Sequence, residues 1–395
     1  MFLGLVCTGR ICRQSATDSL PAPGPGSTTN TGNTVELSSG LGKVRRAKKL
    51  TARRWSTTPL LQEAHLKIGL TYDLRSEYLA MGYDHEATAE LDSEATVSAI
   101  DRTLQSLGHQ TDRIGHLRQL TSRLAAGDRW DLVFNICEGM HGLSRESQVP
   151  ALLEGWQIPC TFSDSFTMAV CLHKGLTKAV LERAGLATAA FHVVETAADI
   201  ERVNLAWPLF VKPVAEGTGK GVSAASVVRT PAELNTACRQ LLARFSQPVL
   251  VERYLPGREF TVGILGTGPA ARVIGTMEVE LLPTAEQGCY SMENKEHWED
   301  RVRYTLIPAG QDPEADAAAE LALQSWLVLN GRDAGRIDIR SAEDGRPAFI
   351  EANPLAGLNP DYSDLPMLAG KAGMSYQQLI GGIVDSAAAR IPQTH

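Results

Sequence analysis

Apolar residues of the first part of the chain form short runs that alternate with apolar positions repeated at helical spacing. The elements that this pattern predicts follow one another as strand 67–72, helix 94–107, strand 110–114, helix 117–126, strand 131–136 and helices 146–156 and 165–185. Strands that alternate with helices form parallel sheets. We therefore expect a parallel α/β domain over residues 65–160.

The pattern changes from about residue 188, where short strand-like segments surround a single helical stretch. These segments are strands 209–213, 221–228, 249–254 and 259–265, with a helix at 231–245. From about residue 268 the expected elements are strands 271–282, 303–307, 333–340 and 346–352 and helices 313–329 and 375–389. The pattern predicts a small α+β subdomain over 161–267 and a C-terminal subdomain over 268–390.

The first 64 residues differ in composition from the rest. They contain nine Lys and Arg against three acids and are rich in Ser, Thr, Gly and Pro. Such a composition cannot bury enough apolar surface to order itself, so we expect a disordered basic leader. An organelle transit peptide, a native disordered extension and residues added by an upstream start codon all fit it.

Composition excludes several classes of protein. The net charge of −7 argues against a general nucleic-acid binder, and no run approaches the roughly 18 apolar residues that span a membrane. The seven cysteines are scattered without a CxxC pair, which is typical of reduced thiols. We expect a cytoplasmic protein, or an organellar one if the leader is a transit peptide.

The first chemical signal is a glycine-rich loop directly after a strand, over 211–221. Lys212 ends the strand, and Gly217, Gly219 and Gly221 follow. Glycines allow backbone N–H groups to approach phosphate oxygens, and the lysines add positive charge. A flexible hairpin loop is the alternative.

The second signal lies about 40 residues later, in the segment 250–262. An apolar strand ends at Glu252, and Glu259 follows a turn. Apolar walls can hold a nucleobase while carboxylates accept the hydroxyl protons of a ribose. A surface hairpin with solvated charges is the alternative.

The third signal joins two expected strands. Alternation places Arg336 and Asp338 on one face of the first strand, and Glu351 and Asn353 on one face of the second. Pairing of these strands brings three oxygen-bearing side chains together beside an arginine, and oxygen ligands suit Mg²⁺ that bridges nucleotide phosphates. A cross-strand salt bridge of Arg336 is the alternative.

In this order and spacing the motifs resemble the ATP-grasp superfamily and, within it, the D-alanine–D-alanine ligases. The resemblance covers about residues 67–385, with weaker agreement at 173–178 and 293–295. It implies an ATP-grasp fold behind an N-terminal parallel α/β domain. It also implies ATP as a substrate, two Mg²⁺ (or Mn²⁺) ions, small amino-acid substrates and a homodimer.

The resemblance assigns roles to matching residues. Contacts to ATP fall on Lys174, Lys212, the loop residues Glu216, Gly217, Thr218 and Gly219, the base-binding Glu252, Arg253 and Leu255, and Glu259 at the ribose. By the same resemblance, Asp338, Glu351 and Asn353 bind the Mg²⁺ ions. Catalytic roles fall to Arg336, to Lys295 at the γ-phosphate, and to the backbone N–H of Gly357.

The match is weakest where the amino acids bind. No residue of 71–77 aligns with the glutamate by which these ligases hold the first substrate's amine. Tyr362 replaces a serine of the carboxylate pocket, with Ser363 adjacent, and Glu296 replaces the tyrosine of the mobile loop. Arg145 and Glu146 are candidate substrate contacts, or else the start of a helix capped by Ser144.

These observations predict a ligase that joins a carboxylate to an amine through an acyl phosphate. D-alanine–D-alanine ligase or a close dipeptide-forming relative is the leading hypothesis. An ATP-grasp ligase for another amino acid or amine is the second. A nucleotide-binding protein without turnover is the third, and the complete set of predicted metal ligands argues against it.

Overall fold

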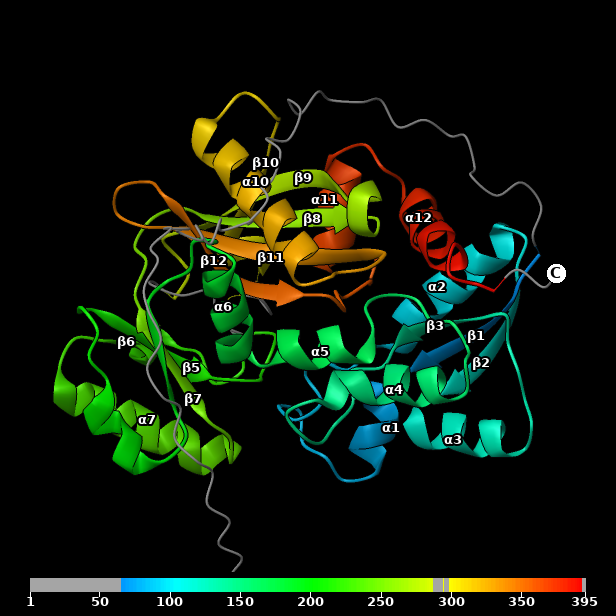
Figure 1. The fold of residues 1–395 in the computed structure, drawn as a ribbon, viewed down its shortest axis with the longest axis horizontal. Coiled ribbons are helices and arrows are strands. Elements are labelled where there is room, and N and C mark those ends of the chain that lie inside the picture. Colours follow the sequence, from blue (N-terminus) through cyan, green and yellow to red (C-terminus); the bar gives the residue numbers. More distant parts are fainter. Residues whose placement is uncertain (1–64, 287–293, 295–297, 393–395) are drawn as a thin grey trace, which may run out of the picture. The chain divides into compact units, whose positions relative to one another are not determined.

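The computed structural model describes residues 65–286, 294 and 298–392, and Figure 1 shows how their helices and strands are arranged. The leader, 1–64, and the predicted catalytic Lys295 lie outside the described residues. One sheet is parallel and two are antiparallel, which confirms the predicted combination of α/β and α+β structure.

The N-terminal sheet is parallel and has the strand order β2-β1-β3. Its elements are β1 (Lys67–Tyr72), α1 (Arg75–Ala80), α2 (Glu94–Ser106), β2 (Gln110–Gly115), α3 (Leu117–Ala125), β3 (Leu132–Ile136) and α4 (Gln148–Gly155). Every residue of β3 is buried, as expected of a parallel strand covered on both faces. Directly after β1, Leu74 forms an isolated parallel bridge with Asp92, at the end of the acidic segment 84–92.

The four-stranded sheet is antiparallel, with the order β4-β7-β5-β6. Its elements are β4 (Phe191–Val194), β5 (Leu209–Pro213), β6 (Val227–Val228), α7 (Pro231–Phe245) and β7 (Val249–Arg253). Helix α7 begins at Pro231, whose missing N–H costs nothing in a first turn, and the side chain of Thr230 accepts a hydrogen bond from the Glu233 N–H. Leu234 and Cys238 of α7 are buried in the core of this sheet.

The five-stranded sheet is antiparallel, with the order β10-β9-β8-β11-β12. Its elements are β8 (Glu259–Leu265), β9 (Arg272–Leu281), α9 (Trp298–Arg301), β10 (Val302–Ile307), α10 (Pro313–Val328), β11 (Ala334–Ser341) and β12 (Pro347–Asn353). Trp326 of α10 is buried in the core of this sheet. A Cβ on Gly335 would lie 2.4 Å from the Trp326 ring, so β11 requires glycine at that position.

The remaining helices join these units. They are α5 (Ser165–Leu172), α6 (Lys174–Arg183), α11 (Asp364–Lys371) and α12 (Tyr376–Ala388). Apolar residues of α11 and α12 share one core with β1, β3 and α2. Helix α12 packs on α2 and β3 of the N-terminal domain, and α11 packs on β8 and β9. None of the helices described combines the length and apolar character needed to cross a membrane.

Three elements differ from the prediction. The strand expected at 221–228 is wrong except for β6, because Gly219 and Gly221 have positive φ and the chain turns there. The helix expected over 165–185 is broken at His173, whose ψ of 88° is not helical and whose side chain caps α6. The helix expected from 146 begins as a 3₁₀ turn at Arg145–Ser147.

Strand β8 belongs to the five-stranded sheet, although the sequence pattern grouped it with the smaller subdomain. The strands of the four-stranded sheet therefore end at Arg253, and those of the five-stranded sheet begin at Glu259. The domain limits drawn at 160 and 267 stay predictions.

A buried carboxylate connects three distant parts of the chain. Asp333, which is not exposed, accepts hydrogen bonds from the Phe162 N–H at 2.7 Å and from the Ser386 hydroxyl at 2.8 Å. Arg390 binds both of its oxygens, at 2.6 and 2.7 Å. The last turn of the fold is thereby fixed to the start of β11.

Replacement of Arg390 by methionine should destabilise the protein, because Asp333 then stays buried without its positive partner. Loss of one partner of a buried pair costs about 3–5 kcal/mol. Urea unfolding followed by tryptophan fluorescence measures the change. The control is Arg303→Met, which breaks an exposed pair with Glu280 and should cost less than about 1 kcal/mol. Equal losses for the two variants would contradict the structural role given to Asp333.

Candidate active site

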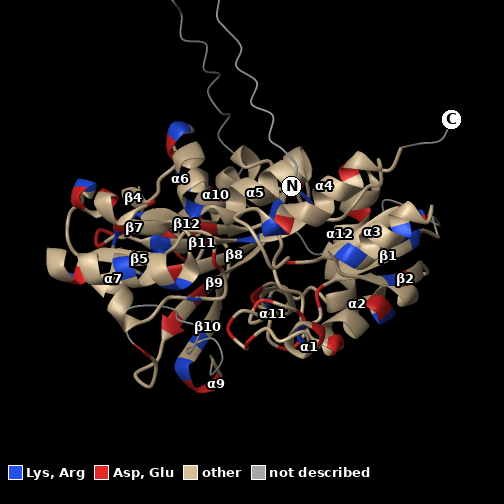
Figure 2. Cartoon of the chain, turned by 90° about the horizontal axis from the view of Figure 1, so that it is seen from below, with Lys and Arg blue, Asp and Glu red and all other residues tan. Residues whose placement is uncertain are grey.

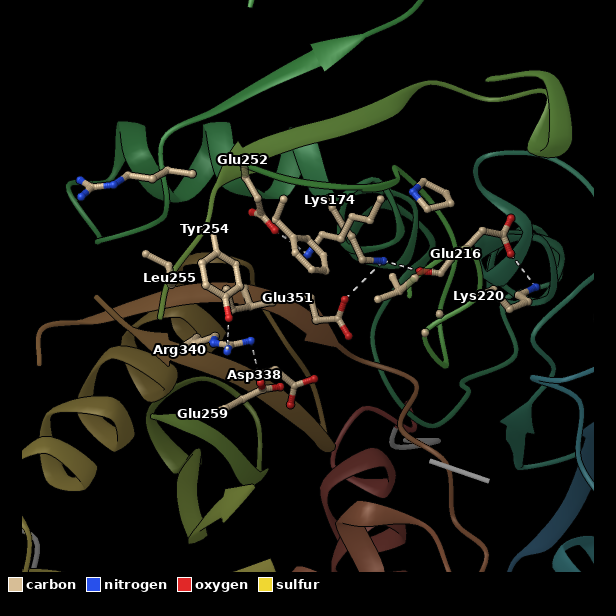
Figure 3. Close-up of a pocket in the computed structure, with 18 residues that line it drawn as sticks. Lys174, Glu216, Lys220, Glu252, Tyr254, Leu255, Glu259, Asp338, Arg340 and Glu351 are labelled. Atoms are coloured by element: carbon tan, nitrogen blue, oxygen red, sulfur yellow. Dashed lines mark hydrogen bonds and ion pairs between the residues drawn. The ribbon is translucent and has the colours of Figure 1, made fainter. Parts of the chain in front are cut away.

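One pocket draws its lining from both antiparallel sheets, and Figure 3 shows its side chains. The predicted site residues that line it are Lys174, Lys212, Glu216, Gly217, Gly219, Glu252, Arg253, Leu255, Glu259, Asp338 and Glu351. They come from segments far apart in the sequence. The fold therefore brings the glycine-rich loop and the segment 250–262 next to Asp338 and Glu351. The pocket is the candidate active site.

A carboxylate between two lysines lies in this pocket. Glu252 at the end of β7 forms ion pairs with Lys178 of α6 at 2.7 Å and with Lys212 of β5 at 2.8 Å. All three side chains are almost fully buried. Burial acts to raise the pKa of Glu252, but the two lysines outweigh it and lower that pKa to about 2. Two ammonium groups and one carboxylate leave an excess of positive charge here.

Lys174 connects the glycine-rich loop with the five-stranded sheet. Its ammonium donates to the carbonyl oxygen of Glu216 at 2.5 Å and lies 3.4 Å from the carboxylate of Glu351 on β12. Figure 3 shows Lys174 between these two groups. A cation at this position contacts the loop and faces the carboxylates of the third motif.

The loop that follows β5 has unusual backbone conformations. Thr218 has a φ of 51° and Gly219 a φ of 73°, both in the left-handed region. A β-branched residue adopts this conformation only where its surroundings hold it. A Cβ on Gly217 would lie 2.6 Å from a carboxylate oxygen of Glu90, so a larger residue there would displace this carboxylate.

Glu90 holds this loop from the N-terminal domain. Its carboxylate accepts a hydrogen bond from the Gly217 N–H at 2.5 Å and lies 3.4 Å from the Lys220 ammonium. Glu90 belongs to the acidic segment 84–92, in which Glu86 also pairs with Arg244 of α7 at 2.5 Å. Figure 2 shows acidic residues gathered on loops around α1 and α11.

The predicted substrate residue Arg145 is bound within this network. Its guanidinium lies 2.7 Å from Glu90 and donates to the carbonyl oxygen of Ala215 at 2.6 Å. Ser144 precedes the 3₁₀ turn but makes no capping hydrogen bond with its side chain. Burial raises the pKa of the neighbouring Glu146 to about 7, despite Arg145. Substrate contacts by Arg145 and Glu146 stay predictions.

The third motif forms as the strand pattern predicted. Strands β11 and β12 pair so that Asp338 lies opposite Glu351, and Arg336 lies opposite Asn353. The Asn353 amide donates to Asp338 at 3.1 Å. Among the residues that the structure describes, Arg336 pairs with Asp338 on its own strand at 2.9 Å and with Asp364 at 2.5 Å, and with no acid across the strand.

The donor atoms of this arrangement determine whether it suits Mg²⁺. Within 65–286, 294 and 298–392 no group of three or more His, Cys, Asp and Glu side chains is arranged for a metal ion. Two carboxylates and an amide oxygen are nevertheless the donors that Mg²⁺ takes from proteins when nucleotide phosphates and water complete its shell. The donor set fits, and the ion stays a prediction.

The remaining predicted residues lie beside Arg336. Asp364, its partner, directly follows Ser363, and the Ser363 hydroxyl accepts a hydrogen bond from the Asn359 N–H at 3.0 Å. A Cβ on Gly357 would lie 2.9 Å from that hydroxyl. Tyr362 is 53% exposed. The structure thus brings Gly357, Ser363 and Arg336 into one neighbourhood, while Tyr362 lies at the surface.

Several residues in or beside the pocket were not predicted. Lys178 lies four residues after Lys174 on one helix, a spacing that places both on the same face and could have revealed it. Arg340 continues the alternation of Arg336 and Asp338 along β11. Tyr254 also lines the pocket, and no pattern in the sequence separates it from an ordinary strand-end aromatic residue.

Comparison with known proteins identifies one matching family model, similar chains and a similar solved structure. A family model described as "D-ala D-ala ligase C-terminus" matches residues 180–385. The D-alanine–D-alanine ligase of Bordetella petrii is 33% identical over 69% of this chain and 80% of its own length. An uncharacterized protein of Sinorhizobium fredii is 30% identical over 65% of this chain and 74% of its own length. A Bacillus anthracis D-alanine–D-alanine ligase solved with ATP has a TM-score of 0.62 at 18% identity, covering 82% of this chain and 97% of that one, which shows a shared fold.

The acidic segment generates a prediction about pH. Burial, followed by the charge of Asp73, raises the pKa of Asp92 to about 7 from 3.8. The folded protein therefore binds this proton more tightly than the unfolded chain, and stability falls as pH rises from about 4 to about 7. Asp92→Asn, which resembles the protonated group, should be more stable than the wild type above pH 7.

The expected gain exceeds about 1.4 kcal/mol, the equivalent of one pKa unit, and should vanish below about pH 4. Urea unfolding across this pH range measures it. The exposed Asp344→Asn is the control and should show no gain at pH 7. A gain for Asp92→Asn that does not change with pH would contradict the raised pKa.

Proposed function

The chain belongs to the D-alanine–D-alanine ligase family, and from this premise we propose that it is an ATP- and Mg²⁺-dependent ligase. In this proposal it joins the carboxylate of one amino acid to the amine of a second molecule through an acyl phosphate. The observation that carries the proposal is the pocket itself, whose lining combines Lys174 and Lys212 with the carboxylates of Asp338 and Glu351. Positive side chains that can bind phosphates lie there together with carboxylates that can bind a metal ion.

ATP is held by three parts of the pocket in this proposal. Apolar and aromatic groups at the end of β7, with Leu255 buried among them, border the base. Glu259 accepts the ribose hydroxyl protons. Lys174 and Lys212 attract the phosphates, and the glycine-rich loop 216–219 covers them. Lys295, outside the described residues, contacts the γ-phosphate as the resemblance implies.

The first step forms an acyl phosphate. A carboxylate oxygen of the amino acid attacks the γ-phosphorus, the bond from this phosphorus to the bridging oxygen breaks, and ADP leaves. Asp338, Glu351 and Asn353 would hold Mg²⁺, which neutralises phosphate charge when bound. The lysines and Arg336 stabilise the negative charge that spreads over the phosphoryl oxygens.

The second step forms the amide bond. The amine attacks the carbonyl carbon, and the oxygen that develops negative charge is stabilised by Arg336 and the N–H of Gly357. Phosphate then leaves and the amine loses a proton. The protein contributes position and exclusion of water more than covalent chemistry.

D-alanine is the substrate that the named relatives favour, with D-alanyl-D-alanine, a peptidoglycan precursor, as product. A different amino acid or amine is the second candidate, and one observation supports it. In these ligases an N-terminal region holds the first substrate. Here that region is an acidic segment, and its Glu90 binds the glycine-rich loop. The side chains of this segment differ from the family pattern in the region where the amine of the first substrate would lie.

Phosphate release from ATP and Mg²⁺ in the presence of single amino acids tests the proposal. D-alanine should stimulate release, with D-alanyl-D-alanine detected by mass spectrometry. Stimulation by another amino acid, with the matching dipeptide, would favour the second candidate. ATP binding without release on any amine or amino acid would contradict ligase function.

Arg336→Ala should reduce kcat by about 100- to 1,000-fold, the range measured for loss of a group that stabilises a developing oxyanion. ATP binding should persist, because this side chain does not line the nucleotide pocket. Steady-state phosphate release and equilibrium ATP titration separate the two effects. The exposed Arg303→Ala is the control, and unchanged kcat in Arg336→Ala would exclude the assigned role.

A further inference from the structure

The candidate active-site pocket is lined by a partly buried arginine that neither the motifs nor the proposed mechanism uses. Arg340 lies on β11, two residues after Asp338 and on the same face of the sheet, and it lines the pocket. Its side chain is only 17% exposed. A guanidinium with so little contact to water requires partners that compensate its charge.

The first partner is the predicted ribose-binding carboxylate. Glu259 on β8 lies directly opposite Arg340 in the antiparallel ladder, which puts both side chains on one face. An Nη1 nitrogen of Arg340 lies 3.2 Å from the Glu259 carboxylate. This contact restricts the carboxylate to the side of the pocket where a nucleoside would lie.

The second partner is the aromatic wall of the same pocket. The Nη2 group of Arg340 donates to the Tyr254 hydroxyl at 3.2 Å, and the guanidinium carbon lies 5.2 Å from the centre of the Tyr254 ring. Tyr254 stacks in turn on Phe210 at 6.4 Å between ring centres. Figure 3 shows Arg340 between Tyr254 and Glu259. One planar group thus connects the end of β7 with β8 and β11.

A third observation concerns the remaining nitrogen. The Nε atom of Arg340 is buried and has no hydrogen-bond partner among the described residues. A buried donor without a partner costs free energy, and an acceptor on a bound nucleoside would remove that cost.

We infer that Arg340 is a positioning residue that fixes Glu259 against Tyr254 and thereby gives the site its preference for ribonucleotides over deoxyribonucleotides. The inference rests on the proposed function only in assuming that the pocket binds ATP. A carboxylate held in one orientation can accept a ribose hydroxyl proton, and a ligand that lacks the hydroxyl leaves the carboxylate unsatisfied. A mobile carboxylate can turn away and loses most of that discrimination.

The test compares the binding of ATP and 2′-deoxy-ATP by titration calorimetry, without an amino-acid substrate. Wild type should bind ATP about tenfold or more tightly than 2′-deoxy-ATP, the fold-change expected for a hydrogen bond to a charged group. Arg340→Met, which keeps the length and the packing on Tyr254, should weaken ATP binding and bring the two affinities within about threefold. Should that variant not fold, Arg340→Lys serves the same test, since one ammonium cannot replace the planar fork.

Arg303→Met is the matched control, because Arg303 forms an exposed cross-strand pair in the same sheet. Its selectivity should equal that of the wild type. Equal weakening of ATP and 2′-deoxy-ATP in Arg340→Met would overturn the inference and leave Arg340 a purely structural residue. Failure of the wild type to bind either nucleotide would instead refute the proposed function. The two failures are therefore distinguishable.

Discussion

The carboxylate of Glu252 lies between the ammonium groups of Lys178 and Lys212 in a region that excludes most water. Burying charges costs several kcal/mol for each ion unless partners compensate them, so removal of Glu252 would leave two buried ammonium groups without the carboxylate that they share. The cluster joins α6 to β5 and β7 and so fixes one wall of the pocket. Its excess positive charge has a functional consequence, because it is suited to receive phosphates.

Elements made of long periodic segments could be predicted from the sequence, since apolar spacing determines them. The paired strands of the third motif are an example: alternation put Arg336 and Asp338 on one strand face and Glu351 and Asn353 on one face of the other strand, and the structure pairs these strands with Asp338 opposite Glu351. The glycine-rich loop could not be predicted in the same way, because its conformation depends on contacts from a distant part of the chain. Thr218 keeps a left-handed φ in a loop that Glu90 holds from more than a hundred residues away. Partners such as Arg340 also depend on strand register, which no local pattern specifies.

The N-terminal domain contributes to the candidate site through charge. Arg145 and Glu90 contact the backbone on either side of Glu216. The domain that would select the amino acid therefore also holds the glycine-rich loop. This connection gives a physical route by which binding in one part of the site can affect the other.

The central claim is that a carboxylate is activated as an acyl phosphate in this pocket. The most direct measurement supplies the amino acid that supports turnover with heavy oxygen in its carboxylate and follows the label by mass spectrometry. The account predicts that one labelled oxygen appears in the released phosphate, because the leaving phosphate takes it from the acyl group. Phosphate that carries no label while the amide product accumulates would contradict the account.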